Sequence, residues 1–104
     1  MERQELLAEI KAALAPAYGR RLHRVVLYGS EARGEGRPDS DIDVLVLLSG
    51  PIHLWDDVRA ALLALYPLSL RWGRPISPKP VDVREYDAGT CPLFRQAEAE
   101  GVTA

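Results

Sequence analysis

The stretch "VVLYGSEARGEGRPDSDIDVLVLL" occupies residues 25–48 and determines the fold. Two apolar runs flank a Gly-Ser turn and a polar loop. The first run, Arg24–Tyr28, predicts a short strand closed by Gly29. The second, Asp41–Leu48, predicts a strand that is apolar on both faces after its first residues, which is typical of the centre of a covered sheet. Asp41 and Asp43 therefore stand at the entrance of a buried strand, where unpaired charges are costly.

The spacing of these two acids predicts that they act together. Residues two apart in a strand project from the same face, so Asp41 and Asp43 lie side by side. Two close carboxylates repel unless a cation holds them. Mg²⁺ suits this position, because it takes one or two carboxylates and prefers the phosphates of a substrate. The alternative is an ordinary solvated strand entry with no metal.

A third acid shows a similar pattern. Asp82 lies between Val81 and Val83 in a predicted strand over Val81–Tyr86. If that strand pairs near the second one, Asp82 joins Asp41 and Asp43, and three carboxylates suffice for two metal ions about 3.5–4 Å apart. Glu85 is the second choice for the third acid, because its position in the predicted strand places its side chain on the opposite face from Asp82.

The turn at Gly29-Ser30 predicts a phosphate site. A strand that ends in glycine lets backbone N–H groups approach a phosphate closely, and Ser30 adds a hydroxyl donor. A phosphate cradle beside a carboxylate pair is what nucleotidyl transfer requires, because metal on the acids polarises the reacting phosphate.

The rest of the chain predicts helices and one short edge strand. A helix over residues 2–15 is expected to stop at Pro16, and a helix over Leu54–Tyr66 at Pro67. The second helix is expected to turn Leu54, Val58, Leu62 and Leu65 or Tyr66 inward. Residues 68–72 suggest an edge strand, and Pro75, Pro78 and Pro80 exclude central pairing after it. Thr90 is the expected N-cap of a last helix that has Pro92 just inside and ends near Glu100.

Composition indicates an ordinary globular protein. The chain has 104 residues, 47% hydrophobic and 27% charged, with a formal net charge of −2. We therefore expect one domain over residues 1–104 and no direct nucleic-acid binding. The N-terminus lacks the apolar core of a signal peptide, and no run is long enough for a membrane helix. The single cysteine, Cys91, favours a reducing, cytoplasmic location.

Gly29-Ser30, ten intervening residues and Asp41-Ile42-Asp43 resemble the signature of the DNA polymerase β-type nucleotidyltransferase superfamily. The fuller string, with Ala32-Arg33-Gly34, is similar to its small prokaryotic branch, the minimal nucleotidyltransferases. The resemblance implies an α+β fold like the polymerase β palm, with a small mixed sheet covered by helices. It runs along most of the chain.

The resemblance also implies roles for individual residues. Asp41 and Asp43 would be the catalytic metal ligands, and Asp82 the third carboxylate. Gly29 and Ser30 would bind the nucleoside triphosphate. Arg33 would either contact phosphate or form a surface ion pair.

Minimal members of this family are antitoxins paired with HEPN-domain toxins. The resemblance therefore implies transfer of AMP from ATP to a partner tyrosine, with two Mg²⁺ ions as cofactors. The sequence has room for little beyond the catalytic palm, so the acceptor is expected to come from a partner or from self-association. Two alternatives stay open. One is a non-catalytic module that senses nucleotide or neutralises a toxin by contact, and the other is a nucleotidyltransferase for a small molecule.

Overall fold

A four-stranded mixed sheet forms the centre of the molecule, with strand order β3-β2-β1-β4. The computed structural model describes residues 2–37 and 40–104. Its strands are β1 (Leu22–Tyr28), β2 (Ile42–Leu48), β3 (Ile76–Asp82) and β4 (Val102–Thr103). β1 runs antiparallel to β2 and β4, whereas β2 and β3 are parallel. The predicted central position of the acid-bearing strand is confirmed, because β2 lies between β1 and β3.

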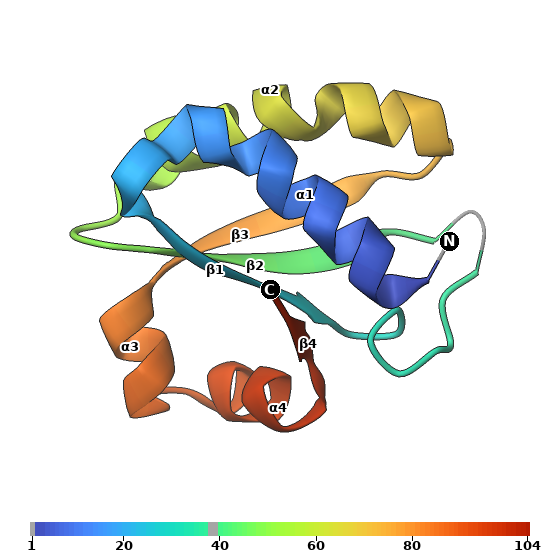
Figure 1. Cartoon of the computed structure of the whole chain (residues 1–104). Coiled ribbons are helices and arrows are strands. Elements are labelled where there is room, and N and C mark those ends of the chain that lie inside the picture. Colours follow the sequence, from blue (N-terminus) through green and yellow to red (C-terminus); the bar gives the residue numbers. More distant parts are fainter. Residues whose placement is uncertain (1, 38–39) are drawn as a thin grey trace.

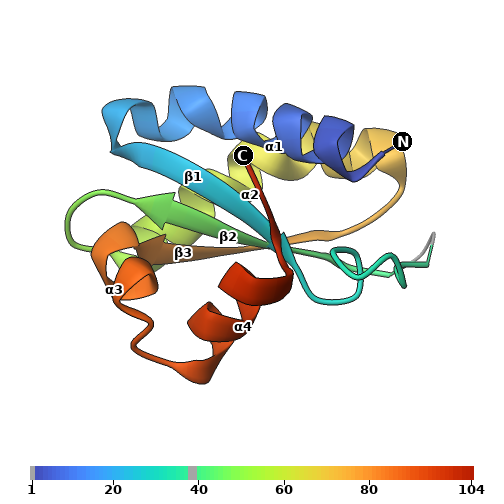
Figure 2. The same ribbon diagram turned by 60° about the horizontal axis from the view of Figure 1, so that its bottom comes forward.

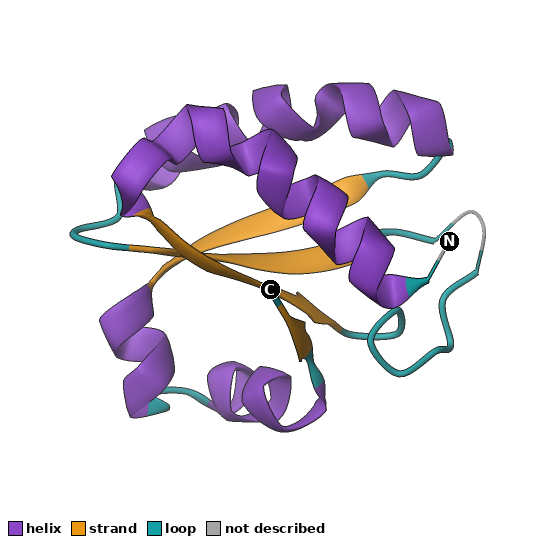
Figure 3. Ribbon diagram, viewed as in Figure 1, coloured by secondary structure: helices purple, strands orange, loops and turns teal. Residues whose placement is uncertain are grey.

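Helices cover both faces of this sheet (Figures 1 and 3). α1 (Arg3–Tyr18) and α2 (Leu54–Trp72) lie together on one face, and a short 3₁₀ turn, Gly19–Arg21, links α1 to β1. α3 (Val83–Ala88) and α4 (Pro92–Glu100) lie on the other face, as the rotated view in Figure 2 also shows. The predicted α+β class, with a small mixed sheet covered by helices, is confirmed.

The alternation of β2 divides the hydrophobic core into two layers. Val44 and Val46 belong to the cluster beneath α1 and α2. Leu45 and Leu47 belong to the cluster that packs against α3 and α4. Because side chains alternate along a strand, Asp43 shares its face with Leu45 and Leu47. The fold thus places this acid on the α3/α4 face of the sheet.

Neither helix stops at the predicted proline. α1 continues past Pro16 to Tyr18, and α2 continues past Pro67 to Trp72, so residues 68–72 form no edge strand. Each extension carries a buried side chain, Tyr18 in α1 and Leu68 in α2. Core packing of these residues outweighs the hydrogen bond that each proline removes. Gly73, whose φ of 63° is left-handed, then caps the C-terminus of α2.

α2 presents a different face to the core from the one predicted. Its buried residues are Asp57, Ala61, Leu65 and Leu68, so only Leu65 was assigned correctly. Leu54, Leu62 and Tyr66 are exposed. Small Ala61 allows close approach to the sheet, and hydrophobicity alone did not reveal that. Across the residues that the structure describes, no helix is both long and apolar enough to span a membrane.

The third strand begins earlier than predicted. β3 ends at Asp82, and Val83–Ala88 form α3 rather than a continuation of the strand. The Asp82 side chain accepts a hydrogen bond of 2.9 Å from the Arg84 backbone N–H and so caps α3. α4 begins at Pro92 and ends at Glu100 as predicted, although its N-cap is Cys91 and not Thr90.

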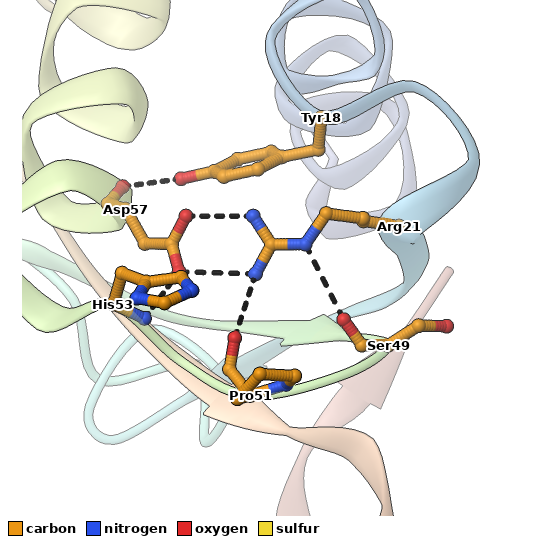
Figure 4. Close-up of polar contacts among 6 residues, drawn as sticks. All are labelled: Tyr18, Arg21, Ser49, Pro51, His53 and Asp57. Carbon is orange, nitrogen blue, oxygen red and sulfur yellow. Dashed lines mark hydrogen bonds and ion pairs between the residues drawn. The ribbon is translucent and has the colours of Figure 1, made fainter.

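A charged clamp fixes the far end of β2 to the start of α2 (Figure 4). The Arg21 guanidinium donates to both carboxylate oxygens of Asp57, at 2.8 and 3.1 Å, and to the carbonyls of Ser49 and Pro51. Asp57 also accepts from the His53 N–H at the helix start. The Arg21 hydrogen bonds hold the pKa of the Asp57 carboxyl below its usual range. The clamp thus compensates a buried carboxylate.

Candidate active site

The two acids of the motif lie at the start of β2. Asp41 immediately precedes the strand and is exposed, and Asp43 is its second residue and is half-buried. Both have the strand parity that points toward the α3/α4 face. The predicted side-by-side placement of the pair agrees with this geometry.

The surroundings of this pair disfavour its negative charge. Burial, and then the nearby charge of Asp41, raise the pKa of the Asp43 carboxyl. Burial, and then the charge of Asp43, likewise raise the pKa of the Tyr28 phenol, which stands opposite Asp43 in the β1–β2 register. The shift at Asp43 shows that its negative charge is disfavoured, and the shift at Tyr28 shows that a second negative charge beside it is disfavoured as well. A bound cation is the natural compensation.

Gly29 brings the turn after β1 directly against Asp43. Its φ is 74°, and a Cβ at this position would lie 2.9 Å from the Asp43 Oδ2. Hydrogen bonds from the Arg33 N–H to the Gly29 carbonyl and from the Glu35 N–H to the Ser30 carbonyl close the turn. The structure thus brings Gly29 against Asp43, and Ser30 follows in the same turn.

A largely buried arginine anchors the segment that follows this turn. Arg74, just before β3, forms an ion pair of 2.6 Å with Glu31, and the two side chains are only 13% and 16% exposed. Arg74 also donates to the backbone carbonyl of Ser40, directly before Asp41. Sequence reasoning missed this pair. Nothing local to Glu31 signals a partner that lies 43 residues away.

Asp82 does not join the acid pair. In the parallel register of β2 and β3, Asp82 stands beside Leu48, whereas Asp43 stands beside Ser77. Five residues of strand separate these two levels, or about 16 Å at the usual rise. By alternation, Asp82 also has the parity of Leu48, whose cluster lies on the opposite face. The expected convergence of Asp82 with Asp41 and Asp43 is therefore wrong, and Glu85, within α3, does not replace it.

Asp82 instead has a local structural partner. Its carboxylate accepts from the Arg84 backbone and side chain, and these hydrogen bonds lower the pKa of Asp82. The prediction failed because the strand starts at Ile76, five residues before Val81. The Pro-rich segment Pro75–Pro80 thus pairs with β2, as an edge strand can.

Ser77 occupies the position predicted for the third acid. Its hydroxyl donates a 3.3 Å hydrogen bond to the Asp41 carboxylate. Ser77 is half-exposed on the same face as Asp43. Its neutral side chain carries no sequence signal, and only the strand register reveals it.

Arg33 lies at the edge of the site, where it forms an ion pair of 2.6 Å with Glu35. It also lines a hollow beside Tyr28 and Gly29 that α4 completes with Gln96. The surface ion pair that the sequence left open is therefore present. Its guanidinium still borders the Gly29 turn.

The donor set fits Mg²⁺ held by two carboxylates. Within residues 2–37 and 40–104, no three His, Cys, Asp or Glu side chains converge as a metal site. The carboxylate pair still suits Mg²⁺, which keeps several waters and completes its shell with substrate phosphates. The close approach of the Gly29 turn to Asp43, together with the raised pKa of the Asp43 carboxyl, favours a cation here.

Comparison with known proteins agrees with this geometry. Residues 7–102 match the nucleotidyltransferase domain family. A protein adenylyltransferase of Methanocaldococcus jannaschii, whose name marks that activity as provisional, is 42% identical over 48 residues. The match covers 46% of this chain and 48% of that protein, so the chain spans about half the length of this relative.

Solved structures share the fold. One, provisionally described as a minimal nucleotidyltransferase, has a TM-score of 0.54 and 29% identity, with 98% of this chain and 95% of that chain covered. Another, a toxin–antitoxin crystal structure with AMP-PNP, has a TM-score of 0.62 and 19% identity, with 91% and 69% covered. The family match spans nearly the whole chain and includes the acid pair and the Gly-Ser turn. The chain belongs to the nucleotidyltransferase domain family.

Proposed function

We propose that this domain is a Mg²⁺-dependent nucleotidyltransferase that moves AMP from ATP to a hydroxyl group. The observation that carries the proposal is the close approach of Gly29 to Asp43, which places a phosphate-accommodating turn against the acid pair. In this role Asp41 and Asp43 hold the metal, and the Gly29-Ser30 turn receives the triphosphate. Bound Mg²⁺ would neutralise charge on the α-phosphate and lower the pKa of the attacking hydroxyl.

The bond changes follow from this placement. The acceptor oxygen forms a bond to the α-phosphorus, the bond from that phosphorus to the pyrophosphate oxygen breaks, and the hydroxyl proton is released. The Asp41 and Asp43 carboxylates would hold the metal on the α3/α4 face of the sheet, and the metal would position the reacting phosphate there. Ser77 orients Asp41 through its hydrogen bond. Arg33 lines the hollow together with Gly29, and we propose it as a residue that contacts phosphate.

For the acceptor we propose a tyrosine of a HEPN-type toxin, which would make this domain the antitoxin of a pair. The relative from Methanocaldococcus jannaschii is named for adenylyl transfer to protein, and a toxin–antitoxin complex shares the fold. The HEPN identity rests on the family resemblance. The single cysteine agrees with a cytoplasmic reaction.

A binding module without catalysis is the main competing function. It would neutralise a toxin by contact and would have no use for a strained carboxylate pair. The raised pKa of Asp43 marks a cost that binding through another surface does not require. Transfer to a small molecule is the third candidate, and it differs only in the acceptor.

Labelled ATP with Mg²⁺ and the co-purified toxin partner tests the proposal. We expect label on the partner, and a loss of at least about 100-fold in rate for Asp41→Asn and for Asp43→Asn. Asp82→Asn is the matched control, because this acid lies at the other end of the sheet. Toxin neutralisation that survives both substitutions without label transfer would establish the binding module instead.

A further inference from the structure

α2 carries an apolar stripe on its outer surface. Every large hydrophobic side chain that is exposed in the described part of the chain belongs to this helix. Leu54 apart, these residues recur at helical spacing along one side, with one charged residue among them. We call this set the outer stripe: Trp55, Arg59, Leu62, Leu63, Tyr66 and Leu70.

The outer stripe faces away from the rest of the molecule. The buried residues Ala61, Leu65 and Leu68 lie on the side of α2 that packs over the sheet. At 100° per residue the outer stripe is centred on the opposite side of the helix. Figure 1 shows α2 as the outermost layer above the sheet, with α1 beside it. Nothing within the described residues covers this surface.

The order of residues in the outer stripe is symmetric about its centre. Read from either end, its positions have the same spacing around the midpoint between Leu62 and Leu63. Two copies of α2 laid antiparallel about a two-fold axis at that midpoint would place Trp55 opposite Leu70 and Leu62 opposite Leu63 of the second copy. A two-fold interface requires this self-complementarity, because one patch must serve both sides.

The single charge of the outer stripe is also accommodated in this register. Arg59 falls opposite Tyr66 of the second copy, where a guanidinium can stack on an aromatic face. The two Arg59 side chains stand seven residues apart along the paired helices, about 10 Å, so their repulsion is weak. A shallow hollow lies where Tyr66 and Leu70 of the second copy would enter, and it is lined by Trp55, Asp56, Val58, Arg59, Leu62 and Leu63. Charge and shape thus favour a second copy.

The exposed area is sufficient for a dimer. Trp55 is 82% exposed, Leu63 70% and Leu70 65%. With about 150–250 Å² for each full side chain of this size, the outer stripe exposes roughly 600 Å² of surface, at the upper limit for a monomer. Pairing would bury about 1,200 Å² in total, which is the lower bound of a specific interface.

From these observations we infer that the protein self-associates as a two-fold dimer through the outer stripe of α2. The acid pair lies on the opposite face of the sheet, so both active sites stay open to an acceptor. The inference is independent of the proposed function. Loss of either one would leave the other intact.

Sedimentation of the purified full chain tests this inference. We expect a dimer at micromolar concentration, and Leu63→Glu is expected to weaken it by about 100-fold or more, because the charge would be buried at the centre of the interface. Leu54→Glu is the matched control, since Leu54 is 55% exposed on the same helix but outside the outer stripe. Circular dichroism of both variants verifies the fold. A monomeric wild-type chain, or a dimer that survives Leu63→Glu, would overturn the inference.

Cysteine cross-linking tests the register. In a Cys91→Ser background, Arg59→Cys and Tyr66→Cys chains mixed under oxidising conditions should form a disulfide-linked dimer. Each variant alone should cross-link far less, since identical positions are about 10 Å apart along the axis. Equal cross-linking of either variant alone excludes the antiparallel register. A third result would also overturn the dimer. If the wild-type chain is monomeric by itself and Leu63→Glu abolishes binding of a toxin partner, that partner and not a second copy covers α2.

Discussion

The Ser77 hydroxyl donates a hydrogen bond of 3.3 Å to the Asp41 carboxylate, and Ser77 stands beside Asp43 in the register of two parallel strands. The residue of β3 that faces the acid pair is therefore a neutral hydroxyl. It supports the proposed metal ligands without adding charge. A carboxylate at this position would supply further ligand oxygens, which gives the first prediction.

Ser77→Asp should tighten Mg²⁺ binding by about tenfold or more, the scale on which a supporting group alters metal affinity. Titration calorimetry of the purified domain measures this affinity. The control is Asp82→Ala, which should leave Mg²⁺ affinity unchanged and lower the melting temperature, because the cap of α3 is lost. A Ser77→Asp chain with unaltered affinity would show that β3 does not contribute to the metal site.

Gly29→Ala and Gly34→Ala separate backbone strain from damage to the site. Both glycines have a left-handed φ, 74° and 76°, so each substitution should cost about 1–2 kcal/mol in urea unfolding. A Cβ at Gly34 meets no atom within 4 Å, whereas one at Gly29 meets the Asp43 carboxylate at 2.9 Å. Only Gly29→Ala should lose transfer activity, by about 100-fold. Equal losses for the two variants would refute a specific role for Gly29.

Asp43→Asn should raise the stability of the metal-free domain at neutral pH. The pKa of Asp43 is raised above 3.8 in the folded state, so its charge destabilises the fold, and stability falls as pH rises from 3.8 through the folded pKa. The substitution removes this loss. The gain should stay below about 1 kcal/mol, since exposed charge pairs contribute no more.

Thermal unfolding between pH 3 and pH 7 measures this difference. The curves of the wild type and of Asp43→Asn should converge below the unfolded pKa and separate above it. Added Mg²⁺ should stabilise only the wild type. A variant that is less stable at pH 7 in the absence of metal would contradict the strained-pair interpretation.

Arg21→Met should destabilise the fold through Asp57, whose side chain is 6% exposed. The expected cost is about 2 kcal/mol, less than for a fully buried pair because Arg21 is 37% exposed. The pKa of Asp57 is lowered in the fold, so this stabilisation is present above its unfolded value and is lost as pH falls. Urea unfolding at pH 7 and pH 3 should show the difference shrinking at pH 3.

Arg71→Met is the control for the clamp. It removes the exposed ion pair of Arg71 with Glu9 and should cost less than about 1 kcal/mol. If Arg21→Met and Arg71→Met lower the free energy of unfolding equally, the buried Asp57 carboxylate is not stabilised by Arg21.

Arg74→Met should raise the KM for nucleotide more than it lowers kcat. Arg74 holds Glu31 and the Ser40 carbonyl, and these flank the turn at one end and the acid pair at the other. An unpaired Glu31 should also lower stability by about 3 kcal/mol. Adding Glu31→Gln to the variant should recover part of the loss. A KM that does not change would show that the anchor serves stability alone.

The sequence predicted the elements with strong local patterns. Alternation and the Gly-Ser turn located β1, β2 and the acid pair, and Pro92 marked the start of α4. The helix ends predicted at Pro16 and Pro67 were wrong, because the buried side chains of Tyr18 and Leu68 stabilise the helix beyond each proline. Features that depend on contacts between distant residues could not be predicted from the sequence. The position of Asp82 depends on the register of β3, and the Arg74–Glu31 pair depends on a contact between distant segments.

The prolines of β3 also bear on how copies of this chain meet in solution. β3 is the outer strand of the sheet, and Pro78 and Pro80 have no N–H on that strand. Residues two apart direct their backbone groups the same way, so two successive donors are missing along the open edge. Such an edge resists the strand-to-strand addition that seeds amyloid-like aggregates. The same prolines that made the strand difficult to recognise in the sequence thus protect this domain from edge-to-edge polymerisation.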